Sequence, residues 1–301
     1  MKSRLVWLLL CFIWGSTWLF IKLGLEDLPP LTFAGIRFLI ASLILVALLK
    51  VWGLSLPRSQ RDWLLLAIVG VTAFSLNYGL IFWGEQYISS GLAALLQATT
   101  PAFGLIIAHF YLPAERMTPA KIFGVLVGVA GVGVVFSNQL SVAGPRALTG
   151  SLALLCSAVC VAYSNVLVKA YCKHLDPTVL AAGQMMCGFV PLLLIGIPLE
   201  GNPFKFHWTP MAFVALFYLA IVGSVIAFIL YYWLMQNMDV TKTLLIALVT
   251  PVVAVTLGMI VLKETLEWRT LAGGMMIISG IALIVMRRAR KVAEPELIST
   301  G

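Results

Sequence analysis

The sequence predicts an all-α polytopic membrane protein, with ten transmembrane helices arranged as two inverted five-helix repeats around a central cavity. Composition, the length of the apolar stretches and an internal repeat support this fold class. Hydrophobic residues make up 61% of the 301 residues and charged residues 11%, whereas a soluble domain carries roughly a quarter charged residues. The mean hydropathy is +1.02. Such a composition is typical of a chain surrounded mostly by lipid.

Ten apolar stretches approach the length of about 20 residues that a helix needs to cross the hydrocarbon core. They lie at 5–24, 31–51, 63–84, 91–111, 119–137, 149–170, 178–198, 209–232, 241–262 and 269–286. Turn-forming prolines separate them, chiefly Pro29, Pro30, Pro57, Pro113, Pro145, Pro177 and Pro203. The stretches are too long for barrel strands and lack period-two alternation. Helices are therefore expected.

The second half of the chain repeats the first at offsets of 147 to 150 residues. The aligned pairs include Lys22 with Lys169, Pro30 with Pro177, Arg37 with Gln184, Trp83 with Trp233, Pro101 with Pro251, and Glu115 with Glu264. We expect a first repeat over residues 1–140, a second over 141–290 and a cytoplasmic tail over 291–301. Because each half holds an odd number of spans, the halves should be inverted relative to one another. A transport site is then expected at their interface.

The basic residues predict the orientation in the membrane. With the N-terminus in the cytoplasm, the inside segments hold 14 Lys and Arg residues and the outside segments hold 5. Cytoplasmic loops carry the excess of basic residues, so both termini should be cytoplasmic. The net charge of +8 is then an orientation signal and an attraction to anionic lipid. Since no basic stripe with interleaved aromatic residues lies outside the spans, no nucleic-acid partner is expected.

Charged residues within the spans are informative because each is costly in lipid and normally faces the protein interior. All 12 acidic residues fall in loops, at span ends or in the tail. The sequence therefore offers no buried carboxylate of the kind that proton-coupled cation pumps use. Arg37 lies about two turns into the second span, and Lys22 and Lys169 occupy equivalent span ends. They favour a substrate with a carboxylate, although the lysines could snorkel and Arg37 could clamp helix-end carbonyls.

Uncharged polar and aromatic residues mark the predicted cavity. The candidate substrate-binding residues are Trp14, Ser16, Asn77, Tyr78, Gln97, Tyr163 and Asn165. The amides are the most informative, because an amide in hydrocarbon must find a partner. Hydrogen bonding between helices is the alternative role for each of these residues.

Two prolines, Pro101 and Pro251, lie in the middle of equivalent spans. Proline removes a backbone donor and frees a carbonyl, which the preceding threonine can satisfy. Matched interruptions in the two halves point to a binding or gating centre, although a static kink would give the same pattern. Glycines at Gly124, Gly128 and Gly280 indicate close helix contacts, which we expect within one chain rather than in a homodimer.

The sequence predicts neither an enzyme nor a bound cofactor or metal. All five cysteines lie in or at the ends of spans, and no further Cys or His completes a metal site within a span. No Walker loop, dinucleotide-binding glycine loop, HExxH motif or nucleophile elbow occurs. ATP-driven transport and enzymatic turnover therefore find no support.

Three segments resemble the two EamA repeats of the drug/metabolite transporter superfamily. They read WGSTWLFIKLG from Trp14, AALLQATTPAFG from Ala93 and ALVTPVVAVTLG from Ala247. The resemblance extends over residues 5–287 and implies a ten-helix carrier of the bacterial inner membrane. Members export amino acids and related metabolites, the YddG-type aromatic amino-acid exporters among them. The family pattern falls on Trp14, Gly15, Ser16, Arg37, Gln97 to Pro101, Glu115, Pro251 and Glu264.

The leading hypothesis is a secondary exporter of small metabolites, with amino acids as the expected substrate class, working by alternating access. Gating or electrostatic roles are expected for Lys22, Arg37, Pro101, Glu115, Lys169, Pro251 and Glu264. The alternatives are an efflux carrier for drugs or other hydrophobic compounds, and a non-transporting membrane scaffold or sensor. The sequence leaves open whether the protein is a monomer or a homodimer.

Overall fold

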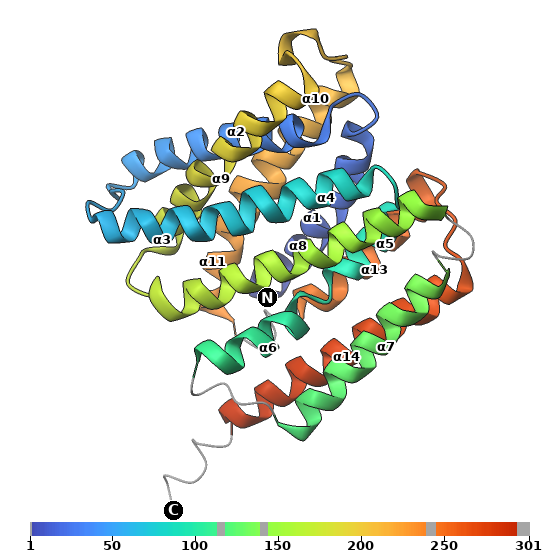
Figure 1. Ribbon diagram of the computed structural model, residues 1–301. Helices are drawn as coiled ribbons and strands as arrows, with labels where there is room; N and C mark the ends of the chain where they lie inside the picture. Colours follow the sequence, from blue (N-terminus) through green and yellow to red (C-terminus); the bar gives the residue numbers. More distant parts are fainter. Residues whose placement is uncertain (1, 113–117, 139–143, 239–244, 294–301) are drawn as a thin grey trace, which may run out of the picture.

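A computed structural model describes residues 2–112, 118–138, 144–238 and 245–293, and every regular element within these ranges is helical (Figure 1). The first predicted repeat holds α1 (Lys2–Gly24), α2 (Pro30–Val51), α3 (Gln60–Gly70), η1 (Val71–Leu76), α4 (Asn77–Glu85), α5 (Ser90–Gln97), α6 (Thr100–Tyr111) and α7 (Pro119–Asn138). The second holds α8 (Gly144–Tyr171), α9 (Pro177–Glu200), η3 (Pro203–Lys205), α10 (Pro210–Phe217), η4 (Tyr218–Ile226), α11 (Ala227–Asn237), α13 (Ile246–Val261) and α14 (Trp268–Ala293).

Seven helical stretches in the described part of the chain are long and apolar enough to cross a membrane. They are Lys2–Gly24, Pro30–Val51, Gln60–Glu85, Ser90–Tyr111, Gly144–Tyr171, Pro177–Glu200 and Pro210–Tyr231. Shorter apolar helices, Lys121–Ser137, Ile246–Val261 and Trp268–Leu283, coincide with most of the three other predicted spans. The prediction of an all-α polytopic membrane protein is confirmed. The count of ten spans, the inverted arrangement and the domain boundaries stay predictions.

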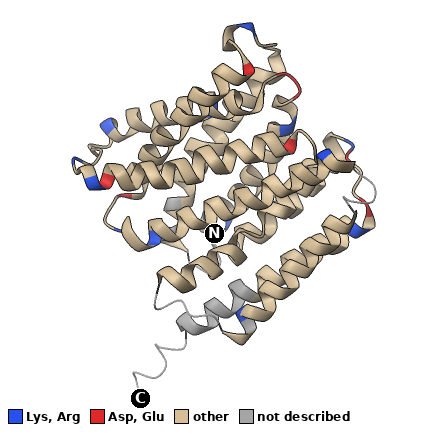
Figure 2. Ribbon diagram, in the orientation of Figure 1, with Lys and Arg blue, Asp and Glu red and all other residues tan. Residues whose placement is uncertain are grey.

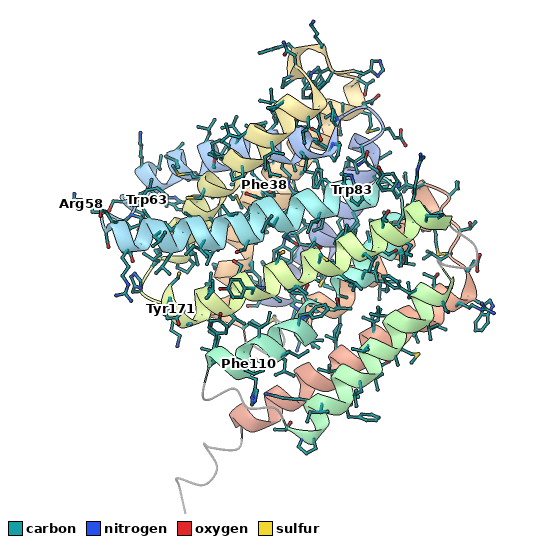
Figure 3. All side chains as sticks on the ribbon, in the orientation of Figure 1. Phe38, Arg58, Trp63, Trp83, Phe110 and Tyr171 are labelled. Atoms are coloured by element: carbon teal, nitrogen blue, oxygen red, sulfur yellow. The ribbon has the colours of Figure 1, made fainter. Side chains whose placement is uncertain are left out.

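Charged residues gather at the ends of the helices, and the lengths between them are almost free of charge (Figure 2). Arg58 and Tyr171 lie near one end of the bundle, whereas Phe38 lies between helices (Figure 3). The Phe38 side chain is fully buried and meets the ring of Phe74 edge-on, with 5.0 Å between their centroids. Because lipid tails are as apolar as these side chains, close packing rather than escape from water holds such helices together.

The main helix contacts join the two predicted repeats: α2 packs on α9, α1 on α13, α4 on α8, and α7 on α14. Two long helices, Gln60–Glu85 and Pro210–Tyr231, each contain a π-helical segment, η1 and η4. The two segments hold Ser75 and Ser224, which are 149 residues apart and so fall at equivalent repeat positions. The hydropathy pattern did not predict these wider turns, which are frequent at functional sites in helices.

Glycines let the backbones of α7 and α14 approach one another closely. A Cβ atom added at Gly131 would lie 2.6 Å from the Gly273 carbonyl oxygen. One added at Gly280 would lie 2.5 Å from the Gly124 carbonyl oxygen. The expectation that these glycines pack within one chain is confirmed.

We expect Gly131→Ala to destabilise the protein and Gly133→Ala to leave it unharmed. A Cβ at Gly131 meets backbone atoms, whereas nothing lies within 4 Å of a Cβ at Gly133 on the same helix. Overpacking at the first position should lower the free energy of unfolding by about 1–3 kcal/mol. At the second, alanine should be neutral or gain up to about 1 kcal/mol from its helix propensity. Thermal unfolding in detergent measures both, and equal melting temperatures would contradict the close contact.

Candidate functional site

A cavity of about 420 Å³ lies among helices of both predicted repeats, within the range of about 300–1,000 Å³ typical of small-molecule sites. Five of the predicted substrate-binding residues line it: Trp14, Asn77, Tyr78, Gln97 and Asn165. The two mid-span prolines, Pro101 and Pro251, line it as well. The residues thus come together from α1, α4, α5, α6, α8 and α13.

The cavity wall combines aromatic and aliphatic side chains with uncharged polar groups. Its aromatic residues are Trp14, Trp18, Phe74, Tyr78, Phe228 and Tyr231, and its polar ones include Thr17, Asn77, Gln97, Thr100, Asn165, Gln184 and Thr250. Among the described lining residues no side chain is charged. The arrangement suits a ligand with a polar part and an apolar or aromatic part.

The side-chain amides of Asn77 and Gln97, both predicted to bind substrate, are hydrogen-bonded to one another. The Gln97 Nε2 donates to Asn77 Oδ1 at 3.1 Å, and Asn77 Nδ2 donates to the Ala73 carbonyl at 3.0 Å. Ser157 Oγ, on α8, lies 2.8 Å from Gln97 Oε1 and donates to it. This chain of hydrogen bonds links α4, α5 and α8. Each amide nitrogen carries two hydrogens, so each can still donate one more bond.

Asn165 on α8 and Gln184 on α9 differ from that pair. Both line the cavity, and neither side chain hydrogen-bonds to any residue in the described ranges. Their donors and acceptors therefore remain available to a bound molecule. The sequence analysis did not select Gln184, although its alignment with Arg37 in the repeat was a signal that the position is polar in both halves.

Two predicted substrate-binding residues, Ser16 and Tyr163, are not among the lining residues. The Ser16 hydroxyl lies 2.6 Å from the hydroxyl of Tyr218 and donates to the Ile13 carbonyl at 2.8 Å. The Tyr163 ring packs edge-on against Tyr111, with 5.9 Å between the ring centroids. Ser16 thus joins α1 to η4 behind the wall, and Tyr163 joins α8 to α6.

Arg37 is buried behind the cavity wall, with 2% of its surface exposed. Its guanidinium carbon lies 5.0 Å from the centroid of Tyr78, a lining residue, and 4.9 Å from that of Phe38. Its Nε donates to Ser224 Oγ in η4 at 3.2 Å. The aromatic faces favour a cation in this position. Arg37 therefore places a positive charge near the cavity without contacting it, and its bond goes to a hydroxyl rather than to a helix-end carbonyl.

Lys22 caps the C-terminal end of α4. Its Nζ donates to the carbonyl oxygens of Glu85 and Ile88, at 2.6 and 2.7 Å. A cation is favourable there because the carbonyl end of a helix carries partial negative charge. Lys169, its repeat partner, is half-buried near the end of α8. Glu115, also assigned a gating role from the sequence, lies outside the described residues.

The two prolines affect their helices differently. The stretch Ser90–Tyr111 is interrupted between α5 and α6, just before Pro101, and Thr100 Oγ1 donates to the Gln97 carbonyl at 2.7 Å. That carbonyl is the one that proline leaves without its helical donor. Pro251, by contrast, lies inside the continuous helix α13. Of the expected matched interruptions, the described residues show only the first as a break.

Three carboxylates join the predicted repeats at the end of the bundle where α1, α4 and α9 end. The Glu264 carboxylate accepts from Ser90 N and Ser90 Oγ, at 2.7 and 2.8 Å, at the start of α5. The Glu200 carboxylate accepts from Leu31 N and Thr32 N, at 2.8 and 2.7 Å, at the start of α2. Carboxylates stabilise helix N-termini because those ends carry unpaired N–H groups and partial positive charge.

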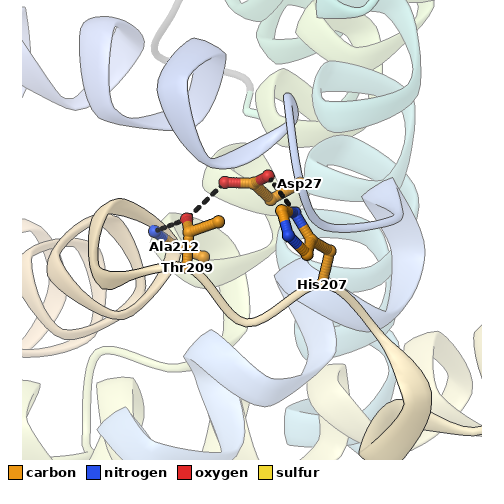
Figure 4. A network of polar contacts seen from close by, with 4 residues as sticks. All are labelled: Asp27, His207, Thr209 and Ala212. Carbon is orange, nitrogen blue, oxygen red and sulfur yellow. Dashed lines mark hydrogen bonds and ion pairs between the residues drawn. The ribbon is translucent and has the colours of Figure 1, made fainter.

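The third carboxylate, that of Asp27, binds the start of α10 (Figure 4). Its Oδ1 lies 2.8 Å from His207 Nδ1, and its Oδ2 accepts a hydrogen bond from Thr209 Oγ1. Thr209 caps α10, since its Oγ1 accepts from Ala212 N at 3.1 Å. The hydrogen bond from Thr209 and then that from His207 hold the pKa of Asp27 below its ordinary value.

We expect Asp27→Asn to reduce the acid sensitivity of the protein. Because the pKa of Asp27 is lowered in the folded state, its contribution to stability is present above the ordinary value of about 3.9. That contribution is lost as the pH falls through the lowered pKa. Melting temperatures of wild type and Asp27→Asn should therefore differ at neutral pH and converge at strong acid. His207→Gln, which keeps the Thr209 bond, should retain part of the difference, and parallel pH profiles would refute the assignment.

One expectation about acidic residues is wrong. The sequence analysis found no buried carboxylate, yet Glu85, at the end of α4, is 0% exposed. Neither of its side-chain oxygens has a hydrogen-bond partner among the described residues. A Cβ added at neighbouring Gly84 would lie 2.8 Å from the Gly150 carbonyl oxygen. The close packing of α4 on α8 therefore covers a span end, which position in the sequence alone could not show.

A multi-pass helical bundle that encloses a polar and aromatic cavity between two halves has the architecture of a small-molecule carrier. Comparison with known proteins agrees. The chain matches the EamA-like transporter family over residues 1–137 and 148–286, and it belongs to that family. It is a multi-pass membrane transporter, as the resemblance in the sequence implied.

The chain matches two relatives over nearly the whole length of both proteins. The chain is 31% identical over 296 residues to "Uncharacterized inner membrane transporter YedA" of Escherichia coli (strain K12), which covers 95% of this chain and 91% of that protein. It is 29% identical over 280 residues to "Uncharacterized transporter YoaV" of Bacillus subtilis (strain 168), which covers 93% of this chain and 95% of that protein. A solved structure described as "Crystal structure of protein" has the same fold, with a TM-score of 0.67 at 21% identity over 96% of this chain and 98% of that one.

Proposed function

We propose that this carrier exports small metabolites, with amino acids as the substrate class, across the bacterial inner membrane by alternating access. The observation that carries the proposal is the cavity, in which the unused amides of Asn165 and Gln184 share the wall with aromatic and aliphatic residues. An amino acid offers both a polar backbone part and a side chain to such a wall. Both termini would lie in the cytoplasm, with ten spans in two inverted halves.

In this proposal the Asn165 and Gln184 amides bind the polar part of the substrate, and Trp14, Tyr78 and Tyr231 contact its side chain. Asn77 and Gln97, already bonded to one another, fix the helices around the site and offer their remaining N–H groups. The Arg37 guanidinium behind Tyr78 gives the site a positive potential that favours a carboxylate, because charges interact strongly where water is scarce.

Alternating access would require the two halves to separate at one end while they close at the other. The carboxylate contacts of Asp27, Glu200 and Glu264 with the opposite half would then hold one end closed and release together. The break before Pro101 and the wide turns of η1 and η4 are the places where helices could bend. The gating roles assigned from the sequence to Pro101 and Glu264 agree with this scheme.

The aromatic wall also supports a second candidate, efflux of hydrophobic compounds. The two candidates differ in the part of the ligand that gives the affinity. An amino acid would depend on the amides, whereas a hydrophobic drug would depend on the rings. Screening the purified protein for thermal stabilisation by single amino acids and by a panel of hydrophobic dyes separates them, because a ligand of the folded state raises the melting temperature.

We expect Asn165→Leu and Gln184→Leu each to weaken binding of the stabilising amino acid by roughly tenfold, the equivalent of one lost hydrogen bond of about 1.4 kcal/mol. Uptake of the labelled amino acid into proteoliposomes should fall in parallel. Gln86→Leu is the matched control, since it removes an exposed amide that lies outside the cavity lining and donates to the Trp83 carbonyl at 3.1 Å. Wild-type binding in both cavity variants would refute the site, and the absence of any flux would refute the function.

A further inference from the structure

Glu85 carries a buried carboxyl group that the proposed substrate site does not use. Its side chain is 0% exposed, and neither side-chain oxygen has a hydrogen-bond partner within the described ranges. An ionised carboxylate in such a place loses its hydration and gains no hydrogen bond in return, which is costly. We propose that Glu85 is a proton-binding site of the carrier, protonated in this closed arrangement and deprotonated when the adjoining end opens. The second part rests on the proposed transport function.

The charges around Glu85 are few. Lys22 on α1 and Glu264 on the α13–α14 connection lie close enough to influence it electrostatically. Of the other elements packed against α4, α8 carries the exposed Arg146 four residues before Gly150, the residue that packs on Gly84, and it carries Lys169 near its opposite end. α5, η1 and the part of α2 before Arg37 carry no titratable side chain. Glu264 opposes ionisation of Glu85, and Lys22 favours it.

The Lys22 ammonium forms its hydrogen bonds with backbone carbonyls and not with the Glu85 carboxyl group. Its Nζ donates to two backbone carbonyls, those of Glu85 and Ile88, and no ion pair joins the two side chains within the described residues. Lys22 thus compensates the end of α4, while the adjacent carboxyl group is left without a donor. A neutral carboxylic acid fits this arrangement better than a carboxylate.

Glu85 is also placed where the two halves are joined. The Glu264 carboxylate binds Ser90 N and Ser90 Oγ, at the start of α5, five residues beyond Glu85 in the chain. Acidic and basic positions gather at this end of α4 (Figure 2). If Glu264 leaves α5 as the end opens, water reaches Glu85 and the proton passes from its carboxyl oxygen to water on that side. When the end closes, the Glu85 carboxylate takes up a proton from water on the same side and becomes neutral again.

The first experiment measures proton occupancy without any transport substrate. Infrared spectra of the purified full-length protein in lipid nanodiscs report the carbonyl band of protonated carboxylic acids. We expect such a band at about pH 7, well above the ordinary glutamate pKa of about 4.3. The band should be absent in Glu85→Gln and retained in Glu264→Gln. Its absence from the wild type, or its presence in Glu85→Gln, would overturn the proposal.

Glutamine has the shape of a protonated glutamate, so Glu85→Gln should fold and melt near the wild-type temperature if the group is neutral. A second measurement follows exchange of the amino acid identified in the thermal screen across proteoliposome membranes, with equal pH on both sides, over a range of pH. The wild-type rate should fall as the pH falls, because opening must release the proton of Glu85, whereas the rate of Glu85→Gln should not follow the pH in this way. Equal pH dependence in both would overturn the link between proton release and opening. If the wild type shows no flux at all, the proposed function fails, and the infrared band still decides proton binding.

Discussion

Lipid offers no hydrogen bonds, so each polar group within these helices has to find a partner inside the protein. Some hydroxyl groups meet this requirement within their own helix, and others, such as that of Ser75 with the Gly188 carbonyl, meet it across helices. Thr100 donates to the carbonyl that Pro101 leaves open, and Thr17 donates to the Trp14 carbonyl at 2.7 Å. Amides meet it between helices, as in the contact of Asn77 with Gln97. The same constraint places carboxylates on the N–H groups that helix N-termini expose, and it accounts for most of the polar contacts in the bundle.

Among the described residues, the buried hydroxyls of Thr32 and Ser151 have no partner, and four further residues with unsatisfied groups bear on the proposed function. Asn165 and Gln184 keep unused hydrogen-bonding groups because they line a cavity that a ligand can enter. Arg37 leaves its Nη1 without a partner among the described residues, and the neighbouring aromatic rings partly compensate its charge. Glu85 can avoid the cost by taking up a proton. Groups that a folded membrane protein leaves unsatisfied are therefore informative about what it binds.

The sequence predicted the helices well, because hydropathy reports directly on contact with lipid. The predicted span 178–198 corresponds to Pro177–Glu200, and the amides at Asn77, Gln97 and Asn165 were found from their cost in hydrocarbon. Gln184 was missed because the direction in which a side chain points depends on helix rotation, which composition does not encode. The burial of Glu85 and the widened turns of η1 and η4 depend on contacts between distant segments.

The glycine contacts of α7 with α14 have a mechanical consequence. Neither helix contributes a residue to the cavity wall, and their backbones touch near Gly131 and near Gly280. Close backbone contact at two places along their length holds the two helices at a short, fixed separation. One helix comes from each predicted repeat, so the pair forms a strut at the periphery that ties the halves together. In the proposed transport cycle, this pair would move as one unit, and changes in the shape of the cavity would come from the helices that line it.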